Sequence, residues 1–182
     1  MLYRLNITLT EEDYFAFNCF HSYESPKGKK QFQRLRLMFV LLMAFLAALF
    51  VYRHGWPRCI PNLISEAVVA TIGYFLIFSN KALRRNMRRQ IKRLTENGKM
   101  PYDSANTFEF YEDKLVEFTN ASRTEKTYPA FERICVLSDR YVYLYTNAIG
   151  AYILPIEQVK AQTDFQSFLA YLKEICPNVE HY

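Results

Sequence analysis

The sequence predicts a membrane α+β protein, in which a two-helix transmembrane hairpin is followed by an antiparallel β domain with a C-terminal capping helix. Two long apolar stretches, alternating strand patterns after residue 104 and a late amphipathic stripe support this fold class. Hydrophobic residues make up 51% of the 182 residues and aromatic residues 16%, which excludes a disordered chain. Lys and Arg outnumber Asp and Glu by 23 to 18, so the chain is mildly basic, with a net charge of +5.

Residues 1–24 are predicted to form a strand and then a helix. Apolar side chains alternate along the start of the chain at Met1, Tyr3, Leu5, Ile7 and Leu9. A helix over 11–23 follows, because Thr10 can cap it and acidic residues favour its positive N-terminal end. An exposed apolar strand edge promotes aggregation, so we expect residues 2–9 to pair with the C-terminal sheet. The alternative is an amphipathic N-terminus that lies on the bilayer.

Two apolar stretches predict transmembrane helix 1 over 35–53 and transmembrane helix 2 over 59–80, with an extracytoplasmic turn over 54–58. A bilayer core needs about 20 residues of helix, and arginine stems can extend the first stretch by snorkelling. The alternatives are a core helix of a soluble protein and a cleaved signal peptide. Two successive apolar segments are hard to bury in a small domain, and the first begins too far from the N-terminus for a signal peptide.

The distribution of basic residues predicts that both termini are cytoplasmic. The turn carries Arg53 and Arg58, whereas the flanks over 27–36 and 81–99 are rich in Lys and Arg. Such flanks stay in the cytoplasm. The chain is therefore predicted to be a multi-pass cell-membrane protein with two spans, in which Cys59 is the extracytoplasmic cysteine.

Residues 81–98 are predicted to form a basic amphipathic helix. Its apolar stripe consists of Leu83, Met87, Ile91 and Leu94. The basic residues on the opposite side are Lys81, Arg84, Arg85, Arg88, Arg89, Lys92 and Arg93. Each Lys or Arg contributes about 1 kcal/mol near an anionic lipid surface, so this face predicts lipid binding. A topology determinant with a solvated face is the alternative. Nucleic acid is not an expected partner, because no recognition motif accompanies the charge.

Glu66 is the charged residue of the second span. A carboxylate inside a membrane segment is a functional-site candidate, here for a proton, an ion or a peptide. It lies only about one to two helical turns from the outer surface, so snorkelling or pairing with Arg53 or Arg58 would also satisfy it.

Residues 104–182 are predicted to form the β domain. Strands are expected near 106–111, 114–119, 123–128, 131–137, 141–146 and 151–154. Their short loops predict a six-strand antiparallel meander, as a sandwich or partly open barrel. A capping helix over 164–176 has a helical apolar stripe, with Thr163 and Gln166 as its capping box. Tyr141, Tyr143 and Tyr145 alternate in one strand, which fits either a half-buried sheet or a partner-facing stripe.

The sequence lacks four common catalytic and nucleotide-binding motifs. It lacks GxxxxGK[ST], GxGxxG, HExxH and GxSxG, and its short acidic runs have no partner histidine or nucleophile. The cysteines are far apart and the histidines are scattered, so we expect no intramolecular disulfide and no zinc site. We expect no enzyme activity, no metal and no cofactor.

Three segments carry a family resemblance: LTEEDYFAF at 9–17, FEFYEDKLVEFT at 108–119 and YPAFERICVLSDRYVYLYTNAIGAYILPIEQV at 128–159. Together with the two apolar spans and their basic exit, they resemble the bacterial YcxB-like family. The resemblance implies that a membrane hairpin precedes a cytoplasmic domain similar to pleckstrin-homology folds (PH-like). It implies no activity, since the family is largely uncharacterised and has no catalytic residues to carry over.

The predicted function is that of a bacterial inner-membrane-anchored interaction or scaffold protein, which presents the PH-like domain at the cytoplasmic leaflet. The expected partners are anionic membrane lipids and an unknown protein, with a homo-oligomer as a further option. One alternative is an immunity or stress-protection protein that acts through the hairpin. Another is a subunit of a small oligomeric transporter, because two spans cannot form a pathway alone.

Overall fold

The computed structural model describes residues 1–56, 60–95, 102, 104–137 and 140–182, and these residues form two compact units. The β unit combines Met1–Phe17 with Leu94–Tyr182 and contains antiparallel sheets and a C-terminal helix. The hairpin unit, Asn18–Arg93, contains two long apolar helices. The helix-plus-sheet composition expected from the sequence is therefore present.

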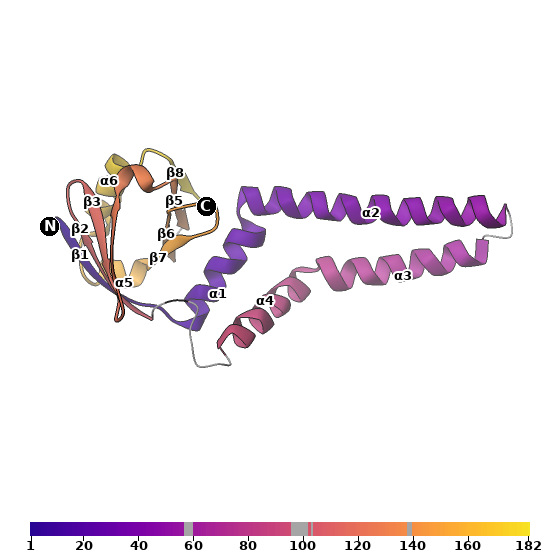
Figure 1. Ribbon diagram of the computed structural model, residues 1–182, viewed down its shortest axis with the longest axis horizontal. Coiled ribbons are helices and arrows are strands. Elements are labelled where there is room, and N and C mark those ends of the chain that lie inside the picture. The colour runs from indigo at the N-terminus through magenta and orange to yellow at the C-terminus, as the bar shows by residue number, and fades with distance from the viewer. Residues whose placement is uncertain (57–59, 96–101, 103, 138–139) are drawn as a thin grey trace. The chain divides into compact units, whose positions relative to one another are not determined.

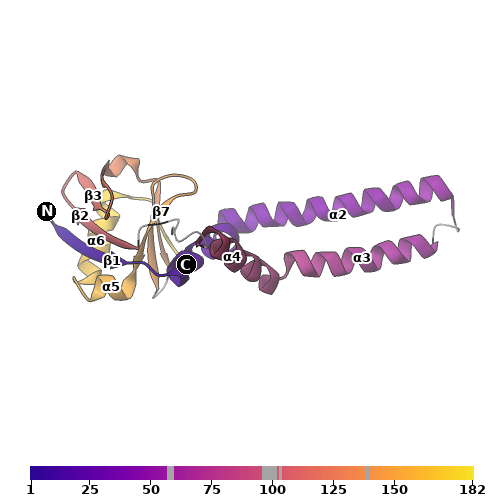
Figure 2. The ribbon, with the colours of Figure 1, turned by 60° about the horizontal axis from the view of Figure 1, so that its bottom comes forward.

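The hairpin unit is built on α2 (Pro26–His54) and α3 (Ile60–Phe78), which run side by side in opposite directions (Figures 1 and 2). Both helices are long and apolar enough to cross a membrane, and no described residue of their apolar windows is buried. Gly55 follows α2 with a φ of 72°, a left-handed conformation that glycine adopts without strain. Residues 57 and 58 of the expected turn, and Cys59 at the start of the expected second span, lie outside the described residues.

Aromatic rings pack between α2 and α3 at the end of the hairpin away from Gly55. The ring centroid of Phe39 lies 5.6 Å from that of Phe78 and 6.2 Å from that of Tyr74. Arg36 donates from Nη2 to the Phe78 carbonyl oxygen at 3.1 Å, and its guanidinium carbon lies 4.9 Å from the Phe32 ring centroid. A cation is stabilising at the negative end of a helix dipole, so Arg36 has a structural role at the end of α3.

A tight elbow precedes α2. The expected helix over 11–23 is split into α1 (Glu11–Cys19) and a π-helical turn, η1 (Phe20–Glu24). Ser25 caps α2, because its Oγ accepts the Gly28 N–H at 3.0 Å and donates to the His21 carbonyl oxygen at 3.0 Å. A Cβ atom at position 28 would lie only 2.7 Å from backbone atoms of His21 and Ser22. The elbow therefore requires glycine at this position.

The basic segment forms a separate helix, α4 (Asn80–Thr95). Ser79 lies between α3 and α4 and caps α4, since its Oγ accepts the Ala82 N–H at 3.2 Å. The expected apolar stripe is buried at Leu83, Met87 and Ile91. Leu94 is 54% exposed, so the buried part of the stripe ends at Ile91. Leu94 lies in the last turn of α4, beyond the packed stretch of the helix.

The described part of the β unit contains two four-stranded sheets, ordered β1-β2-β3-β4 and β7-β6-β5-β8. Their strands are β1 (Tyr3–Thr8), β2 (Ala105–Phe110), β3 (Lys114–Phe118), β4 (Arg123–Thr127), β5 (Arg133–Leu137), β6 (Tyr141–Tyr145), β7 (Ala151–Pro155) and β8 (Val179–His181). The consecutive strands β4 and β5 belong to different sheets, so the expected meander is divided between two sheets, as in the sandwich option. Between β4 and β5 lies a 3-10 turn, η2 (Tyr128–Ala130), in which Pro129 has no N–H for a ladder.

Strand β1 pairs with β2 in antiparallel fashion, which confirms the prediction for residues 2–9. Leu5 lies opposite Phe108, and Ile7 lies opposite Asn106. Leu5 and Ile7 are 0% and 1% exposed. Strand β1 is therefore a core strand, although the whole hairpin unit separates it from β2 in the sequence.

Helix α6 (Phe165–Ile175) caps the core of the β unit (Figure 1). The Phe168 ring centroid lies 5.1 Å from that of Phe110 and 5.2 Å from that of Tyr3. The N-cap is Asp164, so the expected capping box of Thr163 and Gln166 is wrong. The Asp164 carboxylate accepts the Ser167 hydroxyl at 2.5 Å and the Ser167 N–H at 2.8 Å, and these bonds lower the pKa of Asp164. A charged acceptor makes the stronger cap.

Two glutamines at the short helix α5 (Ile156–Lys160) and the turn after it cover the free edge of β1. Gln162 accepts the Asn6 N–H at 2.7 Å and donates to the Asn6 carbonyl oxygen at 2.8 Å. Gln158 makes the same two bonds with the backbone of Thr8, both at 2.8 Å. The two side-chain amides therefore take the place of a neighbouring strand and protect the edge from other pairing.

Replacing Gln158 and Gln162 together with alanine should lower the free energy of unfolding by about 2 kcal/mol, because each hydrogen bond contributes about 0.5–1.5 kcal/mol and water replaces part of the loss. Chemical denaturation of the full chain in detergent measures this change. Gln166→Ala is the matched control, since Gln166 is exposed on α6. A loss no larger than that of the control would contradict the role of the two amides.

Candidate functional site

The basic face of α4 is the most strongly charged surface of the hairpin unit. Each expected basic side chain, from Lys81 to Arg93, is exposed, while the opposite side of the helix is buried. A shallow depression of about 510 Å³ runs along this face. It is lined by Lys81, Arg84, Arg85, Arg88, Arg89 and Lys92. The structure therefore brings the sequence-predicted residues together on one face.

The electrostatic environment of this face is dominated by positive charge. No Asp or Glu occurs in α4 itself. Glu24 from η1 approaches Arg84 at 3.5 Å, but both side chains are about half exposed, and such pairs contribute little. Lys92 and Arg93 lie in the last turn, where the helix dipole favours cations. This arrangement can bind anionic groups through charge, without a geometric requirement for one ligand.

Glu66 lies on the side of α3 that faces α2. It is two helical turns from Gly73, where an added Cβ would lie 4.0 Å from the Phe39 ring. Both carboxylate oxygens are buried and have no hydrogen-bond partner among the described residues. The structure thus shows neither the expected snorkelling nor the expected pair with Arg53, and Arg58 lies outside the described residues.

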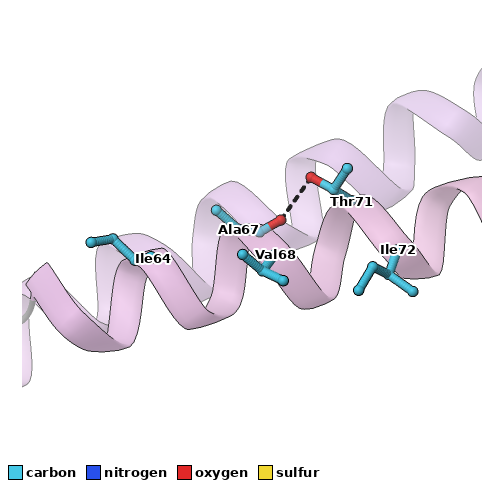
Figure 3. Close-up of a pocket in the computed structure, with 5 residues that line it drawn as sticks. All are labelled: Ile64, Ala67, Val68, Thr71 and Ile72. Carbon is cyan, nitrogen blue, oxygen red and sulfur yellow. Dashed lines mark hydrogen bonds between the residues drawn. The ribbon is translucent and has the colours of Figure 1, made fainter.

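A shallow apolar groove of about 380 Å³ follows α3 (Figure 3). It is lined by Ile64, Ala67, Val68, Thr71 and Ile72. The Thr71 hydroxyl donates to the Ala67 carbonyl oxygen at 2.7 Å, so it is satisfied within the helix. The groove therefore favours hydrocarbon over a polar ligand.

The tyrosines of β6 pack under α1. Tyr143 and Tyr145 are both 0% exposed, and the Phe17 ring centroid lies 5.2 Å from that of Tyr143. The Tyr141 hydroxyl donates to Asp13 Oδ1 at 2.8 Å, in the first turn of α1. Val142 and Leu144, on the other face of β6, are also buried. The partner-facing stripe is therefore wrong, and so is the half-buried sheet for this strand, because β6 is covered on both faces.

A pocket in the β unit, which we name the aromatic pocket, was missed by sequence reasoning. Its volume is about 300 Å³, and Asn106 of β2 and Glu117 of β3 are its polar side chains. Its aromatic lining consists of Tyr14, Phe17, Tyr102, Phe108 and Tyr152. Asn106 is two residues from the core residue Phe108 in β2, and Glu117 is two residues from the core residue Leu115 in β3. Each polar residue therefore lies on the same face of its strand as a core residue. The sequence feature that could have indicated this pocket is the presence of polar residues at strand positions where core residues are expected.

Metal chemistry finds no support in the described residues. Within them, no group of three or more His, Cys, Asp or Glu side chains is placed to hold a metal ion. Cys19, Cys135 and Cys176 are buried, and none of them forms a disulfide in the described part of the chain.

The chain matches no protein-family model, no curated protein and no solved structure.

Proposed function

We propose that this chain is a two-span membrane protein of the YcxB-like type, which holds a PH-like domain at the cytoplasmic leaflet as an interaction module without catalysis. The single observation that carries the proposal is the direct succession of α3 and α4 along the chain. An exposed apolar helix is followed, after Ser79, by a helix with an exposed basic face. Apolar surface followed by cationic surface matches the order of acyl chains and anionic headgroups in a leaflet.

The apolar surface of the hairpin supports membrane insertion. Large side chains on both helices are exposed, among them Phe45 at 59% and Phe75 at 65%. An apolar surface of this extent requires lipid or protein to cover it. The groove along α3 suits an acyl chain, and Trp56, at 71% exposure beside Gly55, suits the opposite interface.

The strand order of the β unit supports the PH-like assignment. PH-like folds have seven strands and a C-terminal helix. Here β1–β4 form one antiparallel sheet and β5–β7 a second one, and α6 follows. Strand β8 departs from that pattern, since it comes after the helix and pairs with β5 in parallel.

The positions of the two flanks support a common side for the termini. The elbow and α4 are both at the end of the hairpin away from Gly55, because the two long helices are antiparallel. Both flanks are basic, so this end would face the cytoplasm. The β unit, which both flanks enter, would then lie beside the anionic leaflet.

Changing Arg84, Arg85, Arg88 and Arg89 together to Gln should remove most of the bound anionic lipid from the protein. Each charge contributes about 1 kcal/mol near an anionic surface, so the preference for phosphatidylglycerol over phosphatidylcholine should fall tenfold or more. The measurement is mass spectrometry of lipids retained by the full chain after purification from a mixed bilayer in maltoside detergent.

The matched control changes the same four residues to Lys, which keeps the charge and removes the guanidinium group. The Lys variant should retain phosphatidylglycerol like the unchanged chain. If the Gln variant retains as much phosphatidylglycerol as the unchanged chain, the basic face determines only the membrane topology. Loss in both variants would assign binding to guanidinium geometry rather than to charge.

Glu66 favours a second candidate function, in which the hairpin itself is the active part. A buried carboxylate without a hydrogen-bond partner among the described residues is costly in an apolar environment and marks functional positions in membrane segments. A protective hairpin or one subunit of an oligomeric transporter would use it to contact a peptide, an ion or a proton.

A further inference from the structure

The aromatic pocket is lined by residues of the β unit alone, and its polar atoms point to a ligand. Asn106 is only 8% exposed, and its Oδ1 has no hydrogen-bond partner in the described part of the chain. The buried Tyr102 hydroxyl also has no partner there. A buried polar group without a partner costs about 1–3 kcal/mol. A ligand with N–H donors would satisfy the Asn106 oxygen and the Tyr102 hydroxyl together.

The charge of the lining favours a positive ligand. Glu117 contributes a carboxylate, and the described lining residues include no Lys, Arg or His. Burial, then the charge of Glu117 and a hydrogen bond to it, raise the pKa of Tyr152, so this tyrosine stays neutral. Burial, followed by the charges of Glu11 and Asp13, raises the pKa of Tyr102 as well. The pocket is therefore acceptor-rich, and Glu117 is the charged side chain among its described lining residues.

The aromatic rings supply a second attraction for cations. The Tyr14 and Tyr102 centroids lie 4.7 Å apart, and the Phe108 and Tyr152 centroids lie 5.2 Å apart. Lys126 Nζ already lies 5.3 Å from the Tyr152 centroid, within the range of a cation–π contact. Aromatic rings around a carboxylate and an amide oxygen are the chemistry that selects organic cations.

We propose that the aromatic pocket binds an organic cation through an ammonium or guanidinium group, carried either by a small amine or by a basic side chain of a peptide partner. The group donates to the Asn106 oxygen, and Glu117 balances its charge. The inference goes beyond the proposed function and does not depend on it, because every lining residue belongs to the β unit.

The test is calorimetric titration of the full chain in maltoside detergent, which carries no choline group to compete. The small-molecule probe is butylammonium, and 1-butanol is its neutral counterpart. The peptide probe is capped Gly-Lys-Gly, and its neutral counterpart carries norleucine in place of lysine. We expect at least one of the two cationic probes to bind, with an affinity at least tenfold higher than that of its neutral counterpart. Butylammonium alone identifies a small amine as the source, and the peptide alone identifies a protein.

Two variants test whether the bound ligand is positively charged. Asn106→Asp keeps the shape of the side chain and adds a negative charge, so it should tighten binding of the cation about threefold or more. Glu117→Gln removes a charge and should weaken binding about tenfold. Glu174→Gln, on the exposed side of α6, should leave binding unchanged. A cooperative unfolding transition shows that a variant is folded. If Asn106→Asp does not fold, Glu117→Gln still tests the proposal.

Three results would overturn the proposal. Equal binding of the cationic and neutral probes would show an apolar cavity without selectivity. Weaker binding by a folded Asn106→Asp variant would show that the oxygen does not face a cation. An absence of binding by every probe would show that water satisfies Asn106. None of these results bears on lipid retention by α4, so the two proposals fail separately.

Discussion

Deleting residues 1–9 should abolish cooperative unfolding of the β unit. The deletion removes β1 and with it the side chains of Leu5 and Ile7, which are almost fully buried against β2 and the core. Each large buried aliphatic side chain contributes about 2–5 kcal/mol, and a domain has only about 5–15 kcal/mol of stability. The measurement is thermal unfolding of the full chain in detergent, followed by the near-ultraviolet dichroism of the tyrosines.

Point variants separate loss of the core from loss of chain length. Leu5→Ala with Ile7→Ala should cost about 5 kcal/mol or more. Met1→Ala with Leu2→Ala is the matched control, because these residues are 65% and 50% exposed in the same segment. An unchanged transition after the deletion would mean that the N-terminus lies elsewhere, for example on the bilayer.

Gly28→Ala should destabilise the elbow, although alanine ordinarily stabilises a helix by about 0.8–1 kcal/mol relative to glycine. The added methyl group would lie 2.7 Å from backbone atoms of His21 and Ser22, which cannot rotate away like a side chain. Overpacking of this kind costs about 1–3 kcal/mol. Hydrogen exchange of the amides over 20–30 should become faster, since Ser25 donates to the Phe20 carbonyl oxygen across the elbow.

Gly73→Ala is the control for this variant within the same unit. A Cβ atom there meets only the Phe39 ring, at 4.0 Å, an ordinary van der Waals distance. The Gly73 variant should therefore be neutral or slightly stabilised. Similar stability of the two variants would contradict a close contact between η1 and α2.

Local patterns account for the parts of the fold that the sequence predicted. Strands β2–β7 lie within a residue or two of their expected positions, because alternation and turn residues are local signals. The basic face of α4 was predictable for the same reason, as its residues are placed by the helical period alone. The pairing of β1 needed one further step, namely that an apolar edge must be covered.

Contacts between distant segments account for what the sequence did not predict. The amides of Gln158 and Gln162 bind a backbone more than a hundred residues away in sequence, and polar side chains on a short helix carry no pattern of such a role. The change of sheet after β4 depends on how two apolar faces cover each other. The aromatic pocket joins side chains of α1, β2, β3 and β7, so only the tertiary structure shows it.

The position of β1 has a consequence for biosynthesis. On the ribosome β1 emerges first, and its partner β2 emerges only after both apolar helices have been made. Under the proposed topology, β1 and β2 meet in one compartment when both spans have inserted, but insertion of one span alone separates them. A chain with one span inserted would leave β1 on the far side of the bilayer, with the β unit incomplete and exposed to proteolysis. Completion of the β unit would thus distinguish a fully inserted hairpin from one in which a single span has inserted.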